Sequence, residues 1–173
     1  MKRALVAVES MYGNTRRIAD AIADGMAASF DVTVVNIGGM PDDLTGYDLL
    51  LVGGPTHAFG MSRPTTRQDA ARQARDIVVP TGAGIREWLD GLTRGHLPPA
   101  ATFDTRINRP RVAGSAAKAA QRRLRRAGAP IVAPATSFYV TDAQGPLAPN
   151  ELERARDWGA QLARDLAGAT TVP

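Results

Sequence analysis

The sequence contains no cysteine and only two histidines, and Lys2 and Lys118 are its only lysines. The lack of cysteine excludes disulfides, thiolate-ligated metals, iron–sulfur clusters and dithiol redox chemistry. His57 and His96 lie far apart in the sequence, so we expect no metal site. Redox chemistry in this chain would therefore require a bound organic cofactor.

Long hydrophobic runs are also absent, so no segment is expected to span a bilayer or to bind a membrane. The apolar run after Lys2-Arg3 is short and is interrupted by Glu9, unlike an export signal, which makes the cytoplasm the expected location. With 173 residues, 44% of them hydrophobic, the chain is long enough to bury the core of one domain. We therefore expect a single domain over residues 1–173.

Acidic residues are outnumbered, which gives a formal net charge of +4, and the densest basic run is Arg122-Arg123 with Arg125-Arg126. Ala117, Ala120 and Leu124 form the inner stripe of the helix expected there, which directs the cations outward. We interpret this run as a solvated helix face, with docking of an acidic protein as the alternative. Nucleic-acid binding is not expected, because no aromatic residues for base stacking lie between the cations.

Hydrophobic periodicity predicts a regular alternation of strands and helices. The expected strands are Ala4–Val8, Val32–Asn36, Asp48–Gly53, Ala101–Asp104 and Ile131–Val140, and the expected helices are Asn14–Ala28, Gly84–Leu92, Ser115–Ala127 and Glu151–Leu166. The first three strands are rich in Val and Leu and barely alternate, as parallel strands buried on both faces do. This order predicts an α/β fold with an open, doubly wound sheet.

The turn Ser10-Met11-Tyr12-Gly13-Asn14-Thr15 joins the first strand to the first helix. Such a junction presents unpaired backbone N–H groups and two hydroxyls at the positive end of the helix dipole, which suits a phosphate. Gly13 lets the backbone approach a ligand, and Asn14 tolerates a left-handed conformation. An ordinary capped turn is the alternative interpretation.

A long connection follows the third strand, from Gly54 to about Pro80, and begins Gly54-Pro55-Thr56-His57-Ala58-Phe59-Gly60. A short helix from Thr65 through Ala74 is expected within it, because Thr65 and Gln68 have capping-box spacing. The connection leaves the same sheet edge as the Ser10–Thr15 turn, and that edge is where ligands bind in open α/β sheets.

These two segments resemble the flavodoxin family. Residues 10–15 look like its flavin phosphate loop, and residues 54–60 look like its second flavin loop. The resemblance implies a five-stranded parallel sheet of order 2-1-3-4-5 with helices on both faces, in the short-chain form of the family, and FMN as the cofactor.

The resemblance also implies roles for individual residues. Ser10, Asn14 and Thr15, with the backbone amides from Met11 to Thr15, would bind the FMN phosphate. Pro55, Thr56, His57, Ala58, Phe59 and Gly60 would border the flavin ring, with Phe59 as its neighbour. Gly60 could turn its carbonyl toward the flavin N5 during one-electron reduction.

A third flavin loop is expected after the fourth strand, and Asp104, Thr105 and Arg106 are its candidate cofactor contacts. This segment departs from the family pattern, because arginines replace its usual glycine-rich, acidic and aromatic character. No tyrosine or tryptophan is available there to cover the outer face of the flavin.

Three functions remain open at this point. The first is an FMN-binding electron carrier that is not itself an enzyme and that serves a redox partner protein or a small-molecule acceptor. The second is an FMN-dependent oxidoreductase that reduces quinones with NAD(P)H, in which Arg63, Arg106 or Arg109 would hold the phosphates of the donor. The third is a flavin-free interaction module that uses its arginines to bind an acidic protein.

Overall fold

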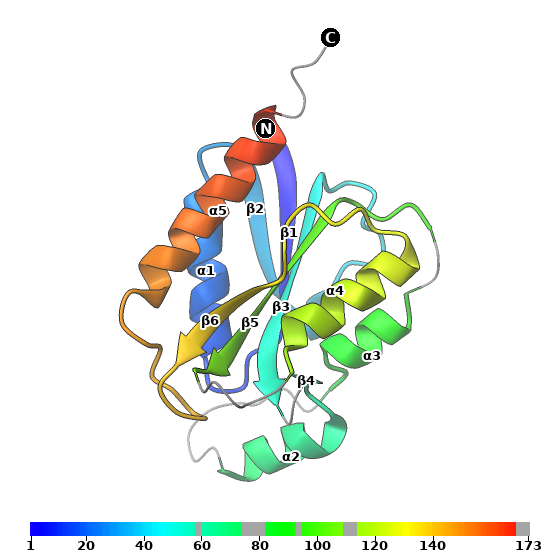
Figure 1. Ribbon diagram of the computed structural model, residues 1–173. Coiled ribbons are helices and arrows are strands. Elements are labelled where there is room, and N and C mark those ends of the chain that lie inside the picture. The colour runs from blue at the N-terminus through cyan, green and yellow to red at the C-terminus, as the bar shows by residue number, and fades with distance from the viewer. Residues whose placement is uncertain (58–59, 74–81, 93–94, 109–113, 169–173) are drawn as a thin grey trace.

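Five parallel strands form a twisted sheet in the computed structural model, which describes residues 1–57, 60–73, 82–92, 95–108 and 114–168 (Figure 1). The strand order is β2-β1-β3-β5-β6. The bounds are β1 Lys2–Val8, β2 Phe30–Asn36, β3 Leu49–His57, β5 Ala100–Ile107 and β6 Thr136–Val140. A short strand, β4 (Gly60–Met61), pairs antiparallel with the end of β3.

Helices cover both faces of this sheet (Figure 1). Their bounds are α1 Asn14–Met26, α2 Pro64–Gln73, α3 Ile85–Asp90, α4 Ala116–Ala127 and α5 Glu151–Gly168, with a 3₁₀ turn η1 at Ile37–Gly39. α1 and α5 lie on one face, α3 and α4 lie on the other, and α2 lies beyond the carboxyl ends of the strands. The expected open, doubly wound α/β fold is confirmed.

The core has two layers because successive strand residues point to opposite faces of the sheet. Ala4, Val6 and Val8 of β1 pack with α1 and α5, whereas Leu5 and Ala7 pack with α3 and α4. A central strand buried on both faces needs apolar residues at every position, which explains its missing alternation.

Two glycines allow α1 and α5 to pack closely. A Cβ on Gly25 would collide with the carbonyl of Arg156, and a Cβ on Gly159 would collide with the carbonyl of Ile22. Both obstacles are backbone atoms, which cannot rotate away as a side chain can. The sequence analysis attached no role to either glycine.

All five expected strands differ in their bounds from the observed strands, and two of them differ most. The expected strand over residues 131–140 is wrong in its first half, because Ile131 makes only an isolated bridge to Ala100 and β6 begins at Thr136. Pro134 lacks the N–H that a ladder requires. Conversely, β3 continues through Pro55 to His57, because β1 ends at Val8 and leaves that part of β3 at a sheet edge, where proline is tolerated.

Within the described residues, no helix is long and apolar enough to cross a membrane. The assignment of residues 1–173 to one domain stays a prediction.

We predict that Gly159→Ala lowers the free energy of unfolding by about 1–3 kcal/mol, because α1 and α5 must separate to admit the methyl group. The matched control is Gly168→Ala in the same helix, where an added Cβ meets nothing within 4 Å. That variant is expected to have the same free energy of unfolding as the wild type, or one that is higher by up to about 1 kcal/mol. Urea unfolding of both variants gives the comparison, and equal midpoints would contradict the proposed collision.

Candidate functional site

A pocket of about 220 Å³ opens at the carboxyl ends of the parallel strands. Its wall comes from the turn after β1, from the carboxyl ends of β3 and β5, and from the end of β6 with the loop after it. The lining residues are Met11, Tyr12, Asn14, Thr15, Pro55, Thr56, His57, Thr105, Arg106, Ile107, Val140 and Ala143. The pocket therefore brings together residues of all three predicted loops.

The turn after β1 lies at this edge of the sheet, and its backbone N–H groups do not form hydrogen bonds within the turn. Gly13 adopts a left-handed conformation with φ 83° and precedes α1 without capping it through a side chain. The backbone N–H groups of residues 11–15 have no hydrogen-bond partner within the described part of the chain. No acidic residue lies in the first turn of α1. Five adjacent donors at a helix N-terminus form a site for an anion.

Hydroxyl groups border the same turn. The Thr15 and Thr105 Oγ1 atoms are 2.7 Å apart and share one hydrogen bond, so one of the two hydroxyl protons remains available to a ligand. Ser10 does not line the pocket, and its Oγ accepts a 3.3 Å hydrogen bond from the Arg16 N–H. Asn14 Nδ2 donates to the Gln144 carbonyl at 3.0 Å, which ties the loop after β6 to this turn.

The apolar part of the pocket comes from Pro55, Ile107, Val140 and Ala143. The sequence analysis missed the last three of these residues. Val140 ends the last strand and Ala143 follows it, and the rule that parallel strands end at one edge predicts such a contribution. Ala58 and Phe59 lie outside the described residues, and Gly60 lies in β4 away from the lining.

Asp104 has a different position from the one expected of a cofactor contact. It is fully buried, and its Oδ2 accepts hydrogen bonds from Thr56 Oγ1 at 3.0 Å, Ser115 Oγ at 2.6 Å and the Ala117 N–H at 3.0 Å. Its carboxylate therefore holds the first turn of α4 and does not line the pocket. Thr56 belongs to the pocket wall and also holds the start of α4, because it accepts a hydrogen bond from the Ala116 N–H at 2.9 Å.

His57 lines the pocket with a buried Nε2 atom that has no partner among the described residues. Burial lowers the pKa of His57 below its ordinary value of 6.5, and the negative charge of Glu9 partly opposes this shift. The imidazole is therefore neutral at pH 7, and it can donate a hydrogen bond to a ligand or accept one from it.

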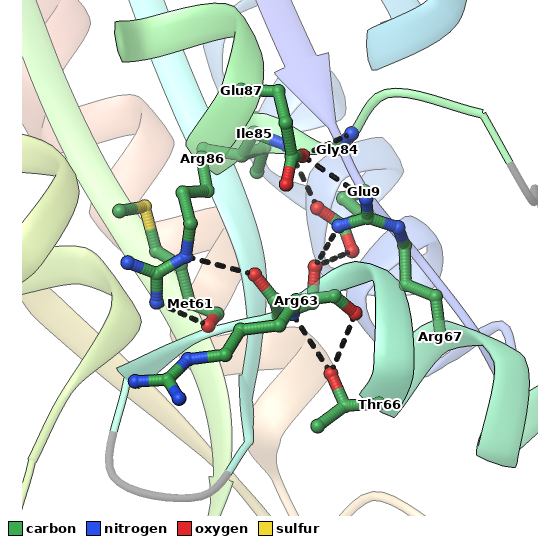
Figure 2. Close-up of polar contacts among 10 residues, drawn as sticks. Glu9, Met61, Arg63, Thr66, Arg67, Gly84, Ile85, Arg86 and Glu87 are labelled. Atoms are coloured by element: carbon green, nitrogen blue, oxygen red, sulfur yellow. Dashed lines mark hydrogen bonds and ion pairs between the residues drawn. The ribbon is translucent and has the colours of Figure 1, made fainter.

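A cluster of ionic side chains lies next to the end of β1 (Figure 2). It was not predicted from the sequence. Glu9 accepts hydrogen bonds from the Ser62 hydroxyl and, at 2.8 Å, from the Ile85 N–H. Arg67 of α2 is 3% exposed, donates to Ser62 Oγ at 2.9 Å and pairs with Glu87 at 3.1 Å. The cluster joins the end of β1, the β4–α2 segment and the start of α3.

This cluster positions α2 against the turn after β1. Met11 is 2% exposed and packs with Ala70 of α2. A Cβ on Gly84 would meet Arg67 at 2.4 Å from Nη1 and Glu9 at 2.7 Å from Oε2, so the cluster requires glycine there. α2 therefore forms a fixed cover over one side of the turn.

Comparison with known proteins agrees with this geometry. Residues 6–78 match the family model described as flavodoxin, a stretch that includes the turn after β1 and the segment after β3. The chain has the flavodoxin fold, and its residues 6–78 resemble the flavodoxin family in sequence.

Solved structures of this family have the same fold along nearly the whole chain. Flavodoxin 2 from Bacillus cereus superposes with a TM-score of 0.69 at 21% identity, over 94% of this chain and 99% of that one. Flavodoxin 1 from the same organism gives 0.67 at 20%, over 94% and 98%. A flavodoxin, WrbA-like protein from Agrobacterium tumefaciens gives 0.59 at 18%, over 97% and 99%. No curated protein sequence matches the chain.

We predict that His57 titrates with a midpoint below pH 6.5 in the folded protein, because burial disfavours the imidazolium. The unfolded chain then binds a proton that the folded chain does not, so stability decreases as the pH falls from about 6.5 toward the lowered pKa. Proton NMR of the imidazole signals measures the midpoint, and His57→Gln assigns the signal. A midpoint at or above 6.5 would refute the burial of this side chain.

A second prediction concerns Glu87. Burial alone would raise the pKa of Glu87, but hydrogen bonds from the Gly84 and Glu87 N–H groups and from Arg67 outweigh it and lower the pKa below 4.5. Glu87→Gln is expected to cost about 1–3 kcal/mol at pH 7, the range for hydrogen bonds to charged groups.

The cost of Glu87→Gln should shrink as the pH falls through the lowered pKa of Glu87, where the native carboxyl also becomes neutral. Chemical denaturation at pH 7 and near pH 3 measures this change. Asp31→Asn, at an exposed position of β2, is the control. A cost that is equal at both pH values would show that the ion pair to Arg67 contributes nothing.

Proposed function

We propose that this protein binds FMN in the pocket at the carboxyl edge and carries electrons through it. The match of residues 6–78 to the flavodoxin family model and the shared fold support a flavin-binding electron-transfer protein. The observation that carries the choice of FMN is the row of five unpartnered N–H groups at residues 11–15, next to the Thr15–Thr105 hydroxyl pair. This arrangement suits a phosphate ester, which riboflavin lacks.

The rest of the pocket also fits a flavin. Pro55, Ile107 and Val140 provide apolar surface for a ring system, and the orphaned His57 Nε2 provides a buried polar atom at its border. When bound, FMN supplies one- or two-electron transfer. The chain itself binds the phosphate, orients the ring between its loops and excludes water from one side.

The expected result is that the protein binds FMN more tightly than riboflavin, because only FMN uses the amide row and the hydroxyls. Thr15→Val removes a hydroxyl with little change in shape. It should weaken FMN binding about 10- to 100-fold, which corresponds to a lost hydrogen bond to a charged group of about 1.5–3 kcal/mol. Riboflavin binding should be nearly unchanged.

Quenching of flavin fluorescence measures both affinities. Thr45→Ala is the control, since this exposed threonine does not line the pocket and, among the described residues, its side chain bonds Asp43. Equal affinities of the wild type for FMN and riboflavin would overturn the proposed phosphate site. Failure to bind either flavin would favour the flavin-free interaction module.

The FMN-dependent quinone reductase is the second candidate. The arginine at position 106 lines the pocket, where it can meet the phosphates of a nicotinamide donor. The fold shared with the WrbA-like protein is compatible with either function. Rapid two-electron reduction of the FMN-loaded protein by NADPH, followed by turnover with a quinone, would favour this enzyme over the carrier.

A further inference from the structure

The positive charge of this protein is concentrated on one helix. α4 contains five basic residues and no acidic residue, and the rest of the chain has 16 basic and 17 acidic residues. The remainder is therefore close to neutral, and the net charge of +4 comes from α4. A charge segregated in this way marks one face of the molecule.

Most of these cations are exposed and unneutralised. Lys118, Arg122, Arg125 and Arg126 are exposed, and none of them forms an ion pair with another described residue. Arg123 is the exception, since it bonds Asp90 of α3 at 2.6 Å. From Lys118 to Arg126 the basic face extends about 12 Å along the helix.

This basic face adjoins the pocket proposed for FMN. Arg106, Lys118 and Arg122 line a shallow depression of about 170 Å³ beside the start of α4. Arg106 also lines the pocket itself. A molecule seated on the first two turns of α4 would thus lie next to the cofactor site.

The first amides of α4 are not available to a small anion. The Ala116 N–H bonds Thr56, the Ala117 N–H bonds Asp104, and the Lys118 N–H bonds Ser115. A site built for one phosphate would use such amides. Side-chain charges spread along about 12 Å of helix instead match several carboxylates on a protein surface. These cations and carboxylates attract each other over about 10 Å at moderate salt.

We propose that the α4 face, formed by Lys118, Arg122, Arg125 and Arg126, is the docking surface for an acidic electron-transfer protein. This inference names the partner class of the proposed carrier and rests on that proposed function for its redox step. In that step one electron leaves the reduced centre of the acidic protein, which is oxidised, and reduces the bound FMN.

The test uses a plant-type [2Fe–2S] ferredoxin, an acidic redox protein, as the probe. The triple variant Lys118→Gln, Arg122→Gln and Arg125→Gln removes three charges from the α4 face. The control triple Arg17→Gln, Arg156→Gln and Arg164→Gln removes three exposed charges from α1 and α5, on the opposite face. The two triples have the same net charge, so a difference between them reports position.

At low salt the α4 triple should bind the probe about tenfold or more weakly than the control triple, and high salt should abolish the difference. Calorimetry measures this affinity with or without FMN. Stopped-flow absorbance of the FMN-loaded protein, mixed with reduced ferredoxin, should show the same ranking in the rate of flavin reduction.

The outcomes separate the two proposals. If FMN does not bind but the affinity ranking holds, the docking face stands and the electron carrier fails. If FMN binds and the two triples bind ferredoxin equally, the docking proposal is overturned. Displacement of ferredoxin by NADP⁺ through these same three cations would also overturn it, in favour of a dinucleotide site.

Discussion

The buried carboxylate of Asp104 connects three elements at the carboxyl edge of the sheet. It lies near the end of β5 and accepts hydrogen bonds from Thr56 at the end of β3 and from Ser115 and Ala117 at the start of α4. All three donors bond Oδ2, and Oδ1 is buried without a partner among the described residues. Because a buried carboxylate is costly without hydrogen bonds, these donors cannot move apart cheaply. The wall of the pocket at Thr56 and the direction of α4 are therefore set by one interaction.

Helices α1 and α4 begin at this edge, and the first backbone N–H groups of the two helices have different hydrogen-bond partners. Asp104 and the Ser115 cap satisfy the first amides of α4, whereas at α1 Gly13 provides no side-chain cap and only the Arg16 N–H, in the third position, bonds a side chain, that of Ser10. Helix N-termini attract negative charge, and here the protein supplies that charge at α4 itself. At α1 it supplies none. The contrast supports the proposal that a phosphate binds at the turn after β1.

Periodicity and strand polarity were sufficient to predict the sheet and the edge where the loops meet. The strand order was predicted from the resemblance to flavodoxins. They could not reveal the Glu9–Arg67–Glu87 cluster, because its members come from three segments whose charges look like ordinary surface residues in sequence. The role of Asp104 was missed for a related reason. A carboxylate after a strand looks the same in sequence whether it faces a ligand or a helix end, and only the position of α4 decides. The late start of β6 relative to the prediction follows from Pro134, which a count of apolar residues does not take into account.

The position of the basic face follows from the same constraints. Asp104 and the capped first turn fix the start of α4 beside the pocket, and the apolar stripe of Ala117, Ala120 and Leu124 holds its inner side against the sheet. The cations between those positions must then face outward, starting next to Arg106. Since the rest of the surface is nearly neutral, a long-range field would draw an acidic partner to this helix first. The packing of α4 thus also decides on which side of the pocket the basic face lies.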